Sequence, residues 1–158
     1  MNVSELCTVR LSEDRKNLEI LDQTLLPGTV KILSLSRLED IREAIKTLRV
    51  RGAPAIGVCA GLAMALVSSQ SAERDYDAFL AEFRRNKSCL ASARPTAVNL
   101  FHALDRMEKT VLENSGLPVD EIKEKLFCEA EKIRSEDIVI SRSIGELGST
   151  LLHDGDGI

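Results

Sequence analysis

The stretch that organises the fold reads RGAPAIGVCAGLAMALVSS and occupies residues 51–69. From Pro54 to Ser69 its residues are apolar or small on every side, and such a helix is stable only when other elements surround it. Its longest apolar run, 53–67, is shorter than the roughly 18 residues that a membrane span needs. We therefore expect a buried central helix, whose Gly57 and Gly61 share one face and let a neighbour approach closely.

The regions on either side of this helix predict an α+β fold. Three β-leaning runs, at 7–11, 17–22 and 29–35, predict a small antiparallel sheet. Apolar residues then recur at helical spacing and predict a mainly α-helical cluster. Ser36 and Glu39 suggest a capping box for the first of these helices, Pro95 suggests the start of another, and the last apolar pattern fits one long helix or two end to end. We expect a β subdomain at 1–35, a helical domain at 36–152 and a truncated linker at 153–158.

Composition narrows the class of partner. The 158 residues carry a net charge of −4 with no basic block, so a nucleic-acid partner is not expected. Four well-separated cysteines and no secretory leader favour reduced thiols and a cytoplasmic location. No apolar run is long enough to predict a membrane partner.

The segment before the central helix has the composition of an anion site. Arg51 and Gly52 directly precede a helix that begins with Pro54. First-turn N–H groups carry partial positive charge, a glycine lets the backbone come close to a ligand, and a guanidinium can fork onto phosphate oxygens. The alternative is that Gly52 and Pro54 only turn the chain and that Arg51 is solvated or paired with an acid. The spacing alone leaves both open.

Arg94 stands in a similar relation to a later helix, because it precedes Pro95 and an apolar-periodic run. Two arginines placed before two proline-opened helices would converge on one dianion. The alternative is a solvated loop arginine.

Among the other polar residues, a helical His102 is expected to be packed or solvated, and Cys59 is expected to be a buried thiol with a raised pKa.

Two longer stretches resemble the methylthioribose-1-phosphate isomerase family. They are RGAPAIG at 51–57 and RPTAVNLF at 94–101, the second followed by ALDRM at 103–107. LDQ at 21–23 with LP at 26–27, and IGE at 144–146 with Gly148, resemble the same family in the same order. The resemblance spans nearly the whole chain. The same fold family includes ribose-1,5-bisphosphate isomerases and regulatory subunits of the translation initiation factor 2B exchange complex.

The resemblance implies an aldose–ketose isomerase that converts 5-methylthioribose 1-phosphate to 5-methylthioribulose 1-phosphate in methionine salvage, as a homodimer without a nucleotide or an obligatory metal cofactor. It implies that Arg51, Gly52 and Ala53 form a substrate-binding stretch and that Arg94 is a second phosphate-binding arginine. In the family, a catalytic cysteine and a later aspartate belong to a larger Rossmann-like carboxy-terminal domain, and the site lies between the domains.

Neither catalytic position falls within this chain, because the cysteine would follow the segment that resembles 152–156, and none of the four cysteines here matches it. We therefore expect an amino-terminal substrate-binding domain without the Rossmann-like domain, inactive alone, and no metal site. The alternatives are a non-catalytic regulatory or interaction module related to the initiation-factor subunits, or part of a ribose-1,5-bisphosphate isomerase.

Overall fold

The computed structural model describes residues 7–155 and begins with the predicted antiparallel sheet. Its strands are β1 (Val9–Leu11), β2 (Leu18–Leu21) and β3 (Ile32–Leu35), in the order β1-β2-β3. Val9 pairs with Ile20, and Ile20 in turn pairs with Leu33. A short 3-10 helix, η2 (Gln23–Leu25), begins the connection from β2 to β3.

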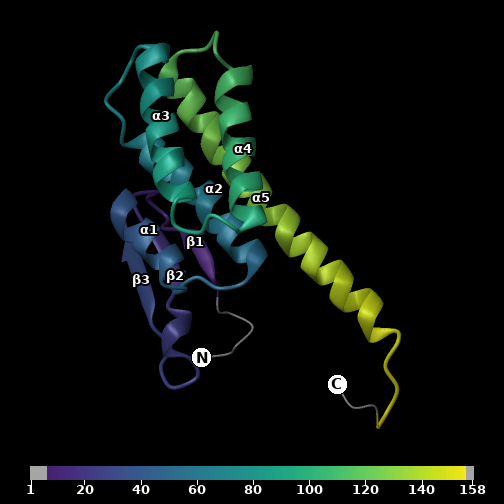
Figure 1. Ribbon diagram of the computed structural model, residues 1–158. Helices are drawn as coiled ribbons and strands as arrows, with labels where there is room; N and C mark the ends of the chain where they lie inside the picture. The colour runs from purple at the N-terminus through teal and green to yellow at the C-terminus, as the bar shows by residue number, and fades with distance from the viewer. Residues whose placement is uncertain (1–6, 156–158) are drawn as a thin grey trace.

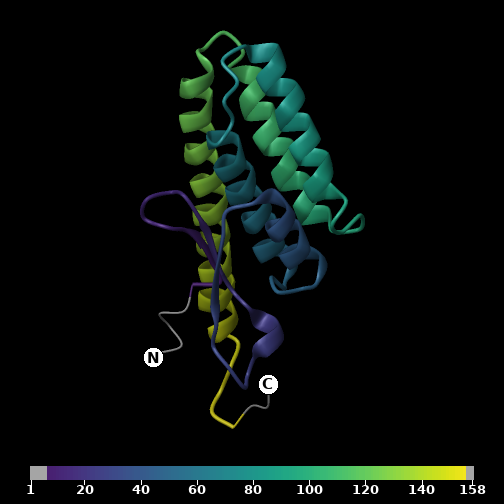
Figure 2. The ribbon, with the colours of Figure 1, turned by 90° about the vertical axis from the view of Figure 1, so that its left-hand side faces the viewer.

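Five helices follow the sheet and complete the α+β fold that the sequence predicts. They are α1 (Leu38–Lys46), α2 (Ala53–Ser69), α3 (Tyr76–Ala91), α4 (Val98–Glu113) and α5 (Val119–Ser149). Figure 1 shows α2 in the middle of the cluster, with α3, α4 and α5 around it and the sheet at one end. β1 and β2 pack against α2, so the sheet stands beside the helical cluster (Figure 2).

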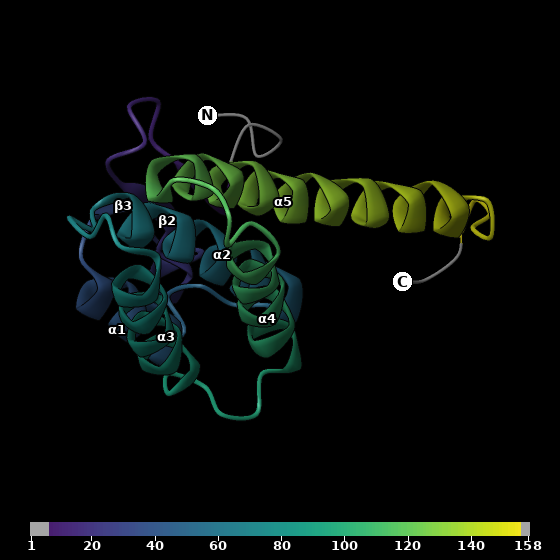
Figure 3. The same cartoon turned by 90° about the horizontal axis from the view of Figure 1, so that it is seen from above.

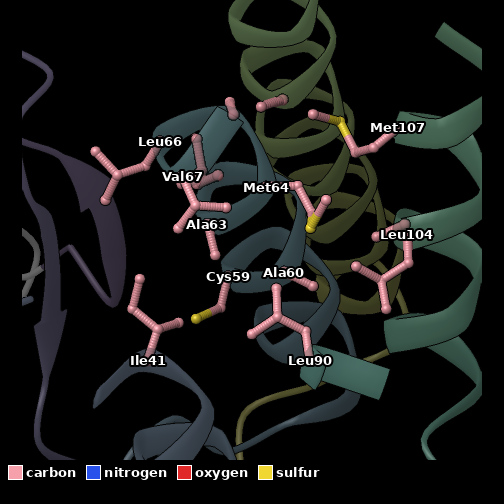
Figure 4. Packing of buried hydrophobic residues seen from close by; sticks show 14 of the residues in the cluster. Ile41, Cys59, Ala60, Ala63, Met64, Leu66, Val67, Leu90, Leu104 and Met107 are labelled. Carbon is pink, nitrogen blue, oxygen red and sulfur yellow. The ribbon is translucent and has the colours of Figure 1, made fainter. Parts of the chain in front are cut away.

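The central helix is buried as its composition predicts. Every residue of α2 from Ile56 to Ser68 is buried, and its neighbours contribute aliphatic side chains to one continuous core (Figure 4). Val9, Leu18 and Ile20 of the sheet belong to that same core. The sheet is therefore held to the helices by packing as well as by the chain connection.

Both central glycines lie at close contacts between helices. A methyl group on Gly57 would lie 2.9 Å from the carbonyl oxygen of Asn99 in α4. On Gly61 it would lie 3.2 Å from the Cδ1 atom of Ile133 in α5. The two glycines thus let α4 and α5 approach α2, as the sequence predicts.

Two predicted helix starts are wrong. The Ser36–Glu39 capping box does not form, because α1 begins at Leu38 with Arg37 as its N-cap and no side chain caps it. Pro95 does not open α4, which begins at Val98 after a turn and has Ala97 as its N-cap. The last apolar pattern, left open between one helix and two, is the single 31-residue helix α5.

The second half of α5 projects away from the rest of the molecule, as Figures 1 and 3 show. Its side chains from Ile138 to Ser149 are all exposed, and five of them are large and apolar: Ile138, Val139, Ile140, Ile144 and Leu147. None of the helices in residues 7–155 combines the length and the apolar character needed to cross a membrane.

Candidate anion-binding site

The connection from α1 to α2 ends in an exposed turn at residues 51–52. Gly52 is the N-cap of α2 and has a φ of 90°, which a residue with a side chain rarely adopts. No atom lies within 4 Å of the place where its Cβ would be, so the space over this turn is open. Gly52 is therefore needed for its backbone conformation, and it leaves room for a ligand at the start of the helix.

The first turn of α2 offers N–H groups to that space. Arg51, Gly52, Ala53 and Pro54 are exposed, and the first intrahelical bond runs from the Ile56 N–H to the Gly52 carbonyl, at 3.0 Å. A helix leaves its earliest N–H groups without internal partners, and proline has none to offer. The N–H groups of Ala53 and Ala55 are therefore available to an anion, where the helix dipole favours negative charge.

The start of α4 differs from the prediction but keeps Arg94 close to it. The Ala97 N–H donates to the Arg94 carbonyl at 3.1 Å, so a turn at 94–97 leads directly into the helix. The Leu100 N–H donates to the Ala97 carbonyl at 2.9 Å, which leaves the N–H groups of Val98 and Asn99 without intrahelical partners. Arg94 is thus attached to a second helix start.

The two helix starts lie side by side. The close approach of Gly57 to Asn99 joins the second turn of α2 to the first turn of α4. A pocket of about 200 Å³ opens at this junction, and α5 closes its far side with Ile133, Glu136, Asp137 and Ile140. The fold therefore brings the 51–54 and 94–98 segments to one end of the molecule.

Of the three arginines carried by α4 and by the turns before α2 and α4, Arg106 lines the pocket, whereas Arg51 and Arg94 do not. Glu129 accepts a hydrogen bond from the Arg106 Nε at 2.9 Å, and Glu136 accepts one from its Nη1 at 2.5 Å. These carboxylates raise the pKa of Arg106, the Glu136 hydrogen bond most of all, and occupy its guanidinium. Within residues 7–155, the side chains of Arg51 and Arg94 have no hydrogen bond or ion pair, so their guanidinium groups stay available.

Two side chains singled out from the sequence have no role that the geometry supports. Cys59 is fully buried, which raises the pKa of its thiol to about 12, so it packs as a small apolar group. His102 is exposed at the mouth of the pocket. Within 7–155, no three His, Cys, Asp or Glu side chains gather to hold a metal ion.

Sequence reasoning missed the ion pair between Asp22 and Arg49, which lies beside this site. Arg49 Nη1 donates to Asp22 Oδ2 at 2.6 Å, and the Asp22 side chain is only 2% exposed. Asp22 is the acid that ends the β-like run at 17–22 and lies in the LDQ stretch at 21–23. No local pattern links it to Arg49, because the two residues are far apart in sequence.

The fold and the paired helix starts define an α+β domain built around one buried helix, and comparison with known proteins gives its family. Residues 49–158 match the family model described as the initiation factor 2 subunit family. This chain belongs to that family.

Its relatives include named isomerases. The chain is 50% identical to the methylthioribose-1-phosphate isomerase of Symbiobacterium thermophilum and 45% identical to the 5-deoxyribose 1-phosphate isomerase of Petrotoga mobilis. Each match covers 95% of this chain but only 42% and 43% of the relative. The chain thus spans less than half the length of these relatives and corresponds to their amino-terminal part.

Two solved structures share the fold. The 5-methylthioribose 1-phosphate isomerase of Pyrococcus horikoshii superposes with a TM-score of 0.90 at 41% identity, over 96% of this chain and 42% of that one. The delta subunit of translation initiation factor eIF-2B from A. fulgidus superposes with a TM-score of 0.85 at 36% identity, over 96% and 43%.

Proposed function

We propose that the chain supplies the substrate-binding part of an aldose–ketose isomerase that converts 5-methylthioribose 1-phosphate to 5-methylthioribulose 1-phosphate, and that Arg51, Gly52, Ala53 and Arg94 hold the phosphate. One observation carries the proposal: two helix starts lie side by side, and each follows an arginine whose side chain has no partner within residues 7–155. The names of the relatives support it, because methylthioribose 1-phosphate and 5-deoxyribose 1-phosphate are both pentose 1-phosphates.

The energies involved predict weak binding by this chain alone. A hydrogen bond to a charged group contributes about 1.5–3 kcal/mol, and a helix dipole adds about 0.3–1 kcal/mol. Two arginines would then contribute about 3–6 kcal/mol, and a dissociation constant of 1 mM corresponds to about 4.1 kcal/mol. The sum corresponds to dissociation constants of about 6 mM to 40 μM, and the entropy lost on association weakens them, so we expect binding no tighter than this range. The rest of a full-length isomerase should strengthen it.

We infer that the catalytic acid and base belong to the part of the isomerase outside residues 7–155, as the family resemblance implies. Isomerisation moves a proton between adjacent sugar carbons, which calls for an acid and a base within hydrogen-bond reach of them. Cys59 is sealed inside the core with a pKa near 12, so it cannot act as one. We therefore expect little or no turnover by this chain. We also expect a cytoplasmic location, and a homodimer that includes a Rossmann-like domain, with no nucleic-acid or membrane partner.

The likeness to the eIF-2B delta subunit supports a second candidate, a non-catalytic regulatory or interaction module. The two functions differ in one measurable way. If the chain belongs to an isomerase, adding the carboxy-terminal part of the Symbiobacterium relative should produce turnover of methylthioribose 1-phosphate. A regulatory module should remain inactive. Part of a ribose-1,5-bisphosphate isomerase would instead prefer that bisphosphate in a binding titration.

Thermal stabilisation tests the proposal directly, because a ligand that binds only the folded chain raises Tm with concentration. We expect methylthioribose 1-phosphate to raise Tm and ribose to leave it unchanged. Arg51→Ala and Arg94→Ala should each weaken binding by roughly 10- to 150-fold, the equivalent of about 1.5–3 kcal/mol. Arg85→Ala is the matched control, because Arg85 is an exposed arginine in α3 with no partner within residues 7–155. A full Tm shift in both site variants would remove these arginines from the site.

A further inference from the structure

We infer that Asp22 is a positioning residue for the anion site: through Arg49 it fixes the backbone that presents Arg51 and the first turn of α2. We name the pair of side chains the Asp22–Arg49 clamp. The inference rests on the proposed function, since it concerns the same site. It adds a residue from the sheet to a site otherwise made of helix starts.

The Asp22 carboxylate is buried and fully engaged. It accepts hydrogen bonds from the Thr24 N–H at 3.1 Å, from the Thr24 hydroxyl at 2.5 Å and from Arg49 Nη1 at 2.6 Å. The Asp22 N–H also donates to the Lys31 carbonyl at 2.8 Å. The carboxylate is therefore fixed in place by the connection between β2 and β3, and it can serve as an anchor.

Arg49 is held to that anchor by its backbone as well as by its side chain. Its carbonyl accepts from the Gln23 N–H at 3.0 Å, and its N–H donates to the Ala44 carbonyl at 2.9 Å. Its Nε donates to the half-exposed Glu43 at 3.2 Å. The residue is thus joined on one side to the β2–β3 connection and on the other to α1.

The Asp22–Arg49 clamp lies next to a backbone segment that has two unusual conformations. Leu48 has a φ of 63°, which is rare for a residue with a side chain, and Gly52 has a φ of 90°. Val50, between them, is fully buried. The segment 48–52 departs from helical geometry at its first and last residues and has few hydrogen bonds of its own. Contacts with other elements therefore determine where Arg51 and Gly52 lie.

A charged pair suits this positioning better than an apolar contact would. Burying a carboxylate is costly, and a buried ion pair is often no more stabilising than apolar residues of the same volume. A guanidinium–carboxylate contact does fix direction, because its hydrogen bonds require a defined geometry. The Arg49 guanidinium is occupied by this contact, whereas the Arg51 side chain, two residues later, is exposed and unpaired within residues 7–155.

The test compares Asp22→Asn, which keeps the shape but removes the charge, with two control variants of the same chain. Lys123→Met removes another buried polar tie, to the Ser71 carbonyl at 2.8 Å, beyond the opposite end of α2, and so controls for lost stability. Glu43→Gln removes only the half-exposed partner of Arg49. The probe is methylthioribose 1-phosphate, titrated by calorimetry, and hydrogen exchange of the Gln23 and Arg49 amides reports on the clamp itself.

We expect Asp22→Asn to weaken binding at least 10-fold and to speed exchange of both amides at least 10-fold, while both controls bind within about threefold of the parent chain. Arg51→Ala should weaken binding by roughly 10- to 150-fold without changing that exchange. Binding by Asp22→Asn within twofold of the parent would overturn the inference. If Asp22→Asn does not fold, Arg49→Gln replaces it with the same expectations.

If the parent chain does not bind the probe, the proposed function of this chain fails and the exchange measurement decides the clamp. Faster exchange of Gln23 and Arg49 in Asp22→Asn, with unchanged exchange in α3, would support it. Unchanged exchange would overturn it.

Discussion

At the scale of single residues, burial determines the chemistry of the thiols. Cys59 lies among apolar side chains in the core (Figure 4). Cys128, on α5, is exposed. A thiol reacts as its thiolate, and burial raises the pKa of Cys59 to about 12. We predict that a thiol reagent at pH 8 labels Cys128 quickly and leaves Cys59 unmodified until the chain unfolds. Peptide mass mapping measures this, and labelling of native Cys59 at the rate of Cys128 would contradict it.

The residues of the candidate site were not equally predictable. Gly52 next to a proline-containing helix start is a local pattern, and the structure gives that glycine the positive φ that such a turn needs. The Asp22–Arg49 clamp has no local pattern, because 27 positions separate its partners and only the packing of the sheet against the helices brings them together. The binding roles of Arg51 and Arg94 stay predictions.

At the scale of elements, the two glycines of α2 make a matched pair for testing helix packing. Gly57→Ala would place a methyl group 2.9 Å from a backbone carbonyl of α4, which cannot move without the helix. Gly61→Ala would meet the end of the Ile133 side chain at 3.2 Å, and that side chain can rotate. We predict that Gly57→Ala lowers the free energy of unfolding by about 1–3 kcal/mol and Gly61→Ala by less. Urea denaturation measures both, and equal values would contradict this account of the contacts.

Hydrophobic periodicity predicts which segments form helices and strands, but it does not predict the residue at which each helix begins. The alternation of strands and the 3.6-residue spacing of the helices depend on which face is buried, and the sequence records that directly. A helix start depends on caps and turns, which tertiary contacts override. Ser36 has the chemistry of a cap, yet Arg37 is the N-cap of α1. Pro95, which the sequence predicts as the start of α4, lies in the turn before that helix.

At the scale of the whole molecule, one apolar stripe of α5 is buried in the core along the first half of the helix and exposed to solvent along the second half. Leu126, Ala130 and Ile133 are buried, and after the polar Asp137 the same spacing of three and four residues continues with Ile140, Ile144 and Leu147, which are exposed. The pattern therefore predicts the stripe but not where its burial ends. That limit is set by how far α2 and its neighbours reach along α5 (Figure 3).

Ile133 and Ile144 test this difference in burial along the stripe, because the change to alanine removes the same atoms from a buried and from an exposed position. Ile133→Ala should lower the free energy of unfolding by about 2–4 kcal/mol, since it deletes packed methyl groups against α2. Ile144→Ala should change it by less than about 0.5 kcal/mol, because its side chain is 67% exposed. Urea denaturation at two protein concentrations gives both values. A large cost for Ile144→Ala that grows with concentration would mean that the projecting half of α5 is covered by a second copy in solution, and a large cost independent of concentration would mean that it folds back onto its own chain.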